Sequence, residues 1–162
     1  MTDAVEIRAA RPEDAGELLR FVRLLAVYEK LEHTVVADAA TIARHMFGPR
    51  PAAEAALAEI DGRNVGFALF FSTFSTFACA PGLYLEDLYV EEEMRGRGIG
   101  KALISWGARL AVERGCARYQ WSVLDWNVPA RDFYKSLGAT ETPEWIGVRL
   151  EGEALARLAA KG

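Results

Sequence analysis

The chain has 162 residues, 51% hydrophobic and 26% charged, which is enough apolar material for a core without metals or disulfides. Its net charge is −4 and its lysines and arginines are scattered, which argues against nucleic acid as a partner. The longest apolar stretch, residues 65–71, is too short to span a bilayer, and residues 1–10 lack the pattern of a signal peptide. Cys79 and Cys116 form no disulfide framework, so a cytoplasmic location is expected.

The N-terminal part of the chain predicts one strand and two helices. Residues 5–8 are typical of a short strand, and apolar residues at helical spacing predict a helix over residues 12–31. A second helix is predicted between Asp38, which suits an N-cap, and Gly48, which suits a C-cap.

The middle of the chain predicts antiparallel strands. Residues 53–60 and 65–77 are two strand candidates, and the Asp-Gly-Arg-Asn sequence at 61–64 between them favours a hairpin. Pro81-Gly82 predicts another turn, which leads into a strand over residues 83–90. This last strand, ending in YLEDLYV, mixes acidic and apolar residues, which is unusual for a buried strand.

The remaining part of the chain predicts alternating helices and strands. In order, these are a helix to about residue 114, a strand over 119–124, a helix over 127–137, a strand over 146–150 and a short helix over 153–160. The order βααβββαβαβα indicates one mixed α/β domain over residues 1–162.

A glycine-rich turn separates the strand ending at Val90 from the next helix. Its sequence, RGRGIGK, covers residues 95–101. A helix N-terminus leaves backbone N–H groups unpaired and carries partial positive charge, and glycines let that backbone approach a phosphate. The pattern predicts an anion site, with a turn that only begins a helix as the alternative. The acidic run at residues 91–93 is interpreted as solvated surface.

Two common phosphate-binding motifs do not fit this turn. A P-loop requires a hydroxyl residue after GxxxxGK, but Ala102 follows Lys101 and the glycine spacing differs. A Rossmann fingerprint follows the first strand of a βαβ unit, whereas this run comes late in the chain. RxxGxG after an acidic-apolar strand is similar instead to the pyrophosphate-binding motif of the GNAT acetyltransferases.

The resemblance covers nearly the whole chain. YLEDLYV, RGRGIG, DWN with a proline two residues after the asparagine, FYKSLGA, LLAVYEKLE and FGPRP look like the diamine acetyltransferase branch of GNAT, whose substrates are polyamines or thialysine-like amino acids. The resemblance implies the GNAT fold, with a mostly antiparallel central sheet, a splayed pair of parallel strands and flanking helices. It also implies acetyl-CoA as donor, no metal and a homodimer.

By this resemblance, three segments form the donor site. The end of the acidic strand would bind the pantetheine arm through Leu88, Tyr89 and Val90. The glycine-rich turn would bind the pyrophosphate through Arg95, Gly96, Arg97, Gly98, Ile99, Gly100 and Lys101. Asn127 would contact the coenzyme, and Tyr134 would stand near the thioester sulfur. Asn127 also suits a simple helix N-cap, and Tyr134 a core aromatic, as alternatives.

Acetyl transfer to an alkylamine requires a proton acceptor, because the pKa of the ammonium form is ~10.4. The resemblance assigns this role to Glu86, directly or through water, and the protonation of the departing thiolate to Tyr134. A backbone N–H near Leu88 would stabilise the oxyanion. Asp87 is adjacent to Glu86, and the two carboxylates can line one pocket only if the strand is bulged.

The acceptor is expected to be the primary amine of a small cationic molecule. Tyr28, Glu29 and Glu32 match a segment that borders the polyamine site in relatives. With Glu86 and Asp87 they would form an acidic cleft that attracts a cation, and a solvated helix end is the alternative interpretation.

One departure bears on the acceptor. Relatives have a tryptophan where this chain has Val148, which leaves amines other than polyamines open. A protein amine or an aminoglycoside is therefore the alternative acceptor. A non-catalytic acyl-CoA-binding sensor is the alternative kind of protein, and the presence of Glu86 and Tyr134 argues against it.

Overall fold

The computed structural model describes residues 4–161. Residues 1–3, the first part of the predicted acidic start, and Gly162, the end of the predicted domain, lie outside this range. The chain divides into two compact units, residues 1–122 and 123–162. No helix within residues 4–161 is both long enough and apolar enough to cross a membrane.

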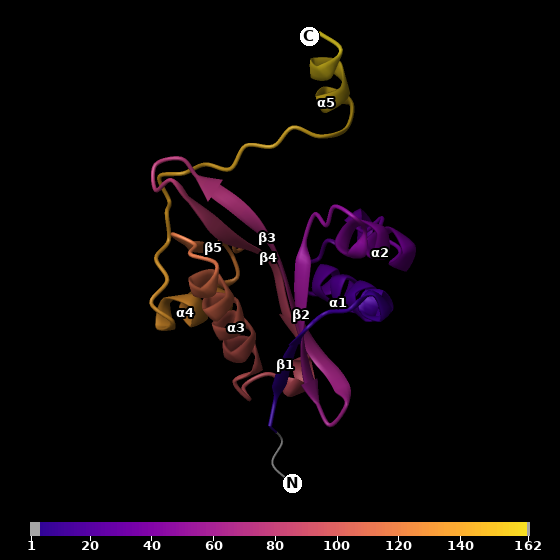
Figure 1. Cartoon of the computed structure of the whole chain (residues 1–162), viewed down its shortest axis with the longest axis vertical. Coiled ribbons are helices and arrows are strands. Elements are labelled where there is room, and N and C mark those ends of the chain that lie inside the picture. The colour runs from indigo at the N-terminus through magenta and orange to yellow at the C-terminus, as the bar shows by residue number, and fades with distance from the viewer. Residues whose placement is uncertain (1–3, 162) are drawn as a thin grey trace. The chain divides into compact units, whose positions relative to one another are not determined.

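The first unit contains a five-stranded sheet with helices, and the second contains helices (Figure 1). The elements of the first unit are β1 (Glu6–Ala9), η1 (Pro12–Asp14), α1 (Ala15–Tyr28), η2 (Glu32–Thr34), α2 (Ala39–Phe47), β2 (Glu54–Ile60), β3 (Arg63–Ser75), β4 (Ala80–Val90), η3 (Glu92–Met94), α3 (Ile99–Glu113) and β5 (Tyr119–Trp121), where η marks a 3-10 turn. Those of the second unit are α4 (Val128–Ser136) and α5 (Gly152–Ala159).

The strands lie in the order β1-β2-β3-β4-β5, and their pairing is mostly antiparallel. Among the strands of residues 4–161, only β4 and β5 are parallel, and their pairing runs from Leu83↔Tyr119 to Leu85↔Trp121. Strand β4 then continues to Val90, beyond the end of β5. The predicted fold class is therefore confirmed: the sheet is mostly antiparallel, contains a short parallel pair and is flanked by helices.

Helices cover both faces of the sheet, with α1 and α2 on one face and α3 on the other (Figure 1). Side chains of a strand alternate between faces, so neighbouring positions of β3 contact different helices. The ring of Phe67 stacks on Phe21 of α1 with centres 5.4 Å apart, and Phe70 meets Trp106 of α3 at 5.8 Å. The middle of β3 is therefore packed on both faces of the sheet.

Several predicted boundaries match the structure for the expected physical reasons. The carboxylate of Asp38 accepts the N–H of Thr41 at 2.7 Å, which caps α2. The hairpin between β2 and β3 turns on Asp61 and Gly62, whose φ angles of +50° and +78° are those of a tight two-residue turn.

The turn predicted at Pro81-Gly82 is wrong, because both residues belong to β4. The chain turns earlier, at residues 76–79, where Cys79 has a φ of +49°. Proline is tolerated near the start of a strand, where its missing N–H costs little. Gly82 is needed for close packing, since an added Cβ would lie 2.5 Å from Oγ1 of Thr73.

The strand predicted at residues 146–150 is also wrong, because this stretch has no regular secondary structure. Ile146 and Val148 are 86% and 95% exposed. A strand is stable only when a neighbouring strand pairs with it, and in the second unit this apolar sequence has no strand beside it among residues 123–161. The strand predicted over residues 119–124 is likewise shorter, ending at Trp121.

Candidate active site

The glycine-rich turn has the backbone geometry of an anion site. Gly96 and Gly98 have φ angles of +77° and +80°, which side-chain-bearing residues rarely adopt. Nothing lies within 4 Å of a Cβ added at either position, so the space beside the turn is open. Gly98 is the N-cap of α3, and the N–H groups of the first helical turn have no acceptor inside the helix.

Exposed cationic side chains stand around this opening. Arg95, Arg97 and Lys101 are all exposed, and Nη1 of Arg97 contacts the sulfur of Met94 at 3.5 Å. Left-handed glycines, outward N–H groups, the positive end of a 15-residue helix and these cations together suit a diphosphate. The residues present therefore fit the pyrophosphate of coenzyme A. We call residues 95–101 the donor turn.

The donor turn is attached to the rest of the first unit through Glu91. This side chain is buried, and its carboxylate accepts Nη1 of Arg20 at 2.6 Å and a close contact from Nη2 of Arg63. The backbone N–H of Glu91 donates to the carbonyl of Val65 at 3.0 Å. The interpretation of residues 91–93 as solvated surface is therefore wrong for Glu91, because two arginines offset the cost of burying its charge.

The predicted pantetheine-binding residues lie at the end of β4. Leu88, Tyr89 and Val90 pair with β3 on one side. On the other side β5 has already ended at Trp121, so its ladder stops before these residues. This geometry suits an extended arm that hydrogen-bonds to the backbone of β4, and the assignment stays a prediction.

A β-bulge decides where the acidic residues of β4 point. Leu85 is opposite Phe70 and Asp87 is opposite Leu69, so Glu86 is an extra residue without a partner on β3. Directly opposed residues share a face of the sheet. The bulge thus turns Asp87 to the face of Leu69, which packs in the core under α1, instead of the face that carries α3. Glu86 is exposed beside it.

Three carboxylates gather where β4 meets the end of α1. Burial, and to a smaller extent the negative charges of Glu86 and Glu29, raise the pKa of Asp87 to about 6. Burial also raises the pKa of Glu29. Glu32, exposed on η2, is not among the charges that act on Asp87. We call Glu29, Glu86 and Asp87 the acidic cluster.

The acidic cluster joins most of the predicted acceptor residues and borders the donor turn. Tyr28, the last residue of α1, lies under the guanidinium of Arg95, whose carbon is 4.8 Å from the ring centre. The same guanidinium is 5.3 Å from the ring centre of Tyr89. Across residues 4–161, no group of three or more His, Cys, Asp or Glu side chains is placed to hold a metal ion.

The remaining predicted residues lie in the second unit. Asn127 is buried and its side-chain oxygen accepts the N–H of Ala130 at 3.4 Å, so its role as an N-cap of α4 is confirmed. Tyr134 is half-buried on α4, with its ring centre 5.5 Å from that of Phe133. The roles of Asn127 and Tyr134 toward the coenzyme stay predictions.

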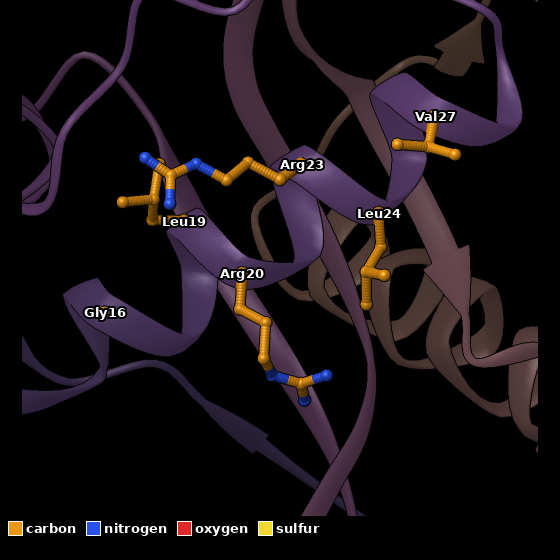
Figure 2. A pocket seen from close by; sticks show the side chains of 6 residues that line it. All are labelled: Gly16, Leu19, Arg20, Arg23, Leu24 and Val27. Carbon is orange, nitrogen blue, oxygen red and sulfur yellow. The ribbon is translucent and has the colours of Figure 1, made fainter. Parts of the chain in front are cut away.

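A separate groove of about 280 Å³ runs along α1 and contains none of the predicted site residues. Figure 2 shows its lining side chains, all from this helix; they are Gly16, Leu19, Arg20, Arg23, Leu24 and Val27. The groove is mostly apolar, and its charged residues are arginines. A cationic acceptor would be repelled there, so the acidic cluster is the better acceptor site.

Two features of this site were not evident from the sequence. The prediction that Glu91 lies on the surface was wrong, and the sequence allowed a bulge without showing that it turns Asp87 toward α1 and leaves Glu86 exposed. The only signal in the sequence was the acidic pair inside an otherwise apolar strand.

Comparison with known proteins agrees with this geometry. The family model described as acetyltransferase (GNAT) family matches residues 21–139. The chain is similar to a thialysine N-epsilon-acetyltransferase of Sus scrofa, with 40% identity over 98% of this chain and 99% of that protein. It is also similar to an L-ornithine N5-acetyltransferase of Arabidopsis thaliana, with 31% identity over 92% of this chain and 85% of that protein.

A solved structure has the same fold. An integron cassette protein of V. cholerae superposes with a TM-score of 0.80 at 28% identity, covering 96% of this chain and 97% of its own. The family match includes strands β2 to β5, the donor turn and α4. The chain therefore belongs to the acetyltransferase (GNAT) family, and it is an acetyltransferase.

Proposed function

We propose that the protein transfers an acetyl group from acetyl-CoA to a primary amine of a small cationic acceptor, a thialysine-like amino acid or a polyamine. The observation that carries this proposal is the acidic cluster beside the donor turn. Two relatives are named for acetylation of thialysine and of L-ornithine, both of them small amines, which supports this class of acceptor. A relative named as a spermidine/spermine acetyltransferase-like protein supports polyamines as the second group.

The acidic cluster would attract the acceptor as a cation. Carboxylates in a partly buried cleft concentrate a positively charged ligand, because their field is less screened there than in water. Glu29 from α1 and Asp87 from β4 come from different elements, so an acceptor between them would contact both. This arrangement favours a molecule with more than one cationic or polar group over a simple monoamine.

The same carboxylates would then remove a proton from the amine. Asp87, with a pKa of about 6, is ionised at pH 7 and is a better proton acceptor than an ordinary aspartate. Glu86 is the base that the family resemblance suggests, and it lies next to Asp87 in the bulge. We therefore assign proton removal to the Glu86–Asp87 pair, directly or through water.

Direct attack would complete the reaction in a complex of enzyme, donor and acceptor. The neutral amine nitrogen forms a bond to the acetyl carbon, the carbon–sulfur bond breaks, and the sulfur leaves with its electron pair. The nitrogen then releases one proton to water, which balances the proton that the thiolate takes up. Backbone N–H groups near Leu88 would stabilise the negative oxygen. Tyr134 is assigned the proton that neutralises the thiolate, on the strength of its position in NVPARDFY.

We further propose that both compact units belong to one acetyltransferase domain over residues 1–162. The family match from residue 21 to residue 139 crosses the boundary at residue 122 and supports this. Limited proteolysis tests it: a single domain resists cleavage between residues 118 and 127, and rapid cleavage there would contradict it.

We propose that the protein forms a homodimer. We also propose that it is located in the cytoplasm. The apolar side chains of the stretch predicted as a strand are exposed in the single chain, together with Trp145 just before it, and a second copy could supply a pairing partner; those of the stretch are Ile146, Val148 and Leu150. Light scattering on the purified protein would report the mass of one or two chains, and cell fractionation would report the location.

An amine panel tests the proposed function. The protein is incubated with acetyl-CoA and thialysine, ornithine, spermidine, a peptide N-terminus or an aminoglycoside, while thiol release is followed. Small cationic amines should give the fastest release. Release only with the peptide or the aminoglycoside would change the acceptor class, and coenzyme binding without release from any amine would favour a sensor.

A further inference from the structure

Arg95 connects the two halves of the proposed site. Its backbone begins the donor turn directly after η3. Its Nε donates to the backbone carbonyl of Val90 at 3.0 Å. Its guanidinium lies 4.8 Å from the ring centre of Tyr28 and 5.3 Å from that of Tyr89, within the range of a cation–π contact. One side chain thus bridges the donor turn, the end of β4 and the end of α1.

Both aromatic rings stand beside the acidic cluster. Tyr28 directly precedes Glu29 at the end of α1. Tyr89 is opposite Phe67 on β3, and Asp87 is opposite Leu69, so Tyr89 and Asp87 share the face of the sheet under α1. The guanidinium of Arg95 packs on these two rings. If it moved, the rings that border Glu29 and Asp87 would lose that contact.

We propose that Arg95 is a positioning residue that couples binding of the donor to binding of the acceptor; this rests on the proposed function. A diphosphate held by the donor turn fixes the backbone from which Arg95 extends. The guanidinium then holds Tyr28 and Tyr89 in place, and the end of α1 stays against β4. The acceptor meets an ordered cluster and binds more tightly. Because linkage is reciprocal, the acceptor also tightens coenzyme binding by the same factor.

The geometry requires an arginine. The planar guanidinium can lie on two aromatic faces while its Nε donates to the carbonyl of Val90. The ammonium of a lysine is a compact, strongly hydrated point charge and cannot make all three contacts at once. The positive charge alone is therefore not sufficient for the coupling.

Calorimetry of coenzyme A with and without saturating thialysine measures the coupling. Spermidine replaces thialysine if the amine panel identifies it as the better acceptor. For the unchanged protein we expect the Kd of coenzyme A to fall about fivefold when the amine is present. In Arg95→Lys and in Tyr28→Leu this ratio should fall to about one. Tyr28→Phe keeps the ring and should keep the ratio.

The two Tyr28 variants decide the result. Tyr28 lies outside the donor turn, so these variants should still bind coenzyme A, and the ratio can be measured in them even if Arg95→Lys no longer binds the coenzyme. An undiminished ratio in Tyr28→Leu would overturn the inference. So would a ratio of one in the unchanged protein when coenzyme A binds and the amine is acetylated. Failure of coenzyme A to bind, or of every amine to be acetylated, would instead contradict the proposed function.

Discussion

The donor turn and the acidic cluster are neighbours that are built in opposite ways. The donor turn is seven consecutive residues, and its shape comes from glycines with positive φ at the start of a helix. The acidic cluster joins residue 29 to the distant pair 86 and 87, and its chemistry depends on burial and on one bulge. The difference suggests that the donor site tolerates changes elsewhere in the fold, whereas the acceptor site does not.

The largest effect is expected from removal of the half-buried carboxylate of Asp87. Asp87→Asn should lower the rate of acetyl transfer by roughly 10²- to 10⁴-fold, because a positioned proton acceptor contributes about that much. For the unchanged protein, kcat/KM should rise with pH through about 6 as Asp87 ionises, and the variant should lose that rise. Initial rates from pH 5 to 9 measure both.

Glu86→Gln is the matched comparison for this variant, because it removes the neighbouring, exposed carboxylate. A larger loss in Glu86→Gln than in Asp87→Asn would assign proton removal mainly to Glu86. Unchanged rates in both variants would exclude the pair from proton removal.

The second prediction concerns the free energy of unfolding, which the same variant, Asp87→Asn, should raise although it lowers the rate. The pKa of Asp87 is raised from 3.8 to about 6, so the folded state binds the proton more tightly than the unfolded state. Stability is therefore lost as pH rises from about 4 to about 6, by at most about 3 kcal/mol. Asp87→Asn should increase the free energy of unfolding at pH 7.5 by up to that amount.

Urea denaturation at pH 7.5 and at pH 4 measures this change. The gain should shrink toward zero at the lower pH, where the aspartate of the unchanged protein is protonated in the folded state. Glu92→Gln changes an exposed carboxylate and should alter stability little at either pH. Equal stability of Asp87→Asn and the unchanged protein at pH 7.5 would mean that the surroundings of Asp87 do not disfavour its charged form.

The donor turn gives the third effect. Gly98→Val places a β-branched residue at a φ of +80°, which costs about 1–3 kcal/mol or distorts the turn. The Kd of coenzyme A should rise roughly 10- to 100-fold, as measured by calorimetry. Gly16→Ala, at an open position of α1, is the control and should leave the Kd unchanged. Unimpaired binding by Gly98→Val would remove this turn from the donor site.

The smallest effect concerns the attachment of the donor turn. Glu91→Gln removes a buried charge that receives Arg20 and Arg63, and it should lower the free energy of unfolding by about 1.5 kcal/mol. Glu93→Gln removes an exposed partner of the same Arg63 and should lower the free energy of unfolding much less, because an exposed ion pair contributes little. Thermal melts compare the two, and an equal effect would mean that burial of Glu91 contributes nothing.

Local features of the amino-acid sequence determined the elements, the donor turn and the family. Helical spacing, Asp38 and Asn127 as caps, the Asp-Gly hairpin and the RxxGxG run each act within a few residues, because they depend on backbone angles and on the nearest hydrogen bonds. The wrong predictions occur where a local signal needs a distant partner. Pro81-Gly82 resembles a turn but pairs with β3, and residues 146–150 resemble a strand but have no neighbouring strand among residues 123–161.

Only the tertiary structure decided the chemistry of the acidic residues. The bulge at Glu86 turns Asp87 toward α1, packing of α1 brings Glu29 close to it, and two arginines from other elements let Glu91 be buried. The physical reason is that the pKa of a carboxylate depends on the water it loses and the charges it meets. Both depend on which surfaces pack together, which adjacent residues in the chain do not specify.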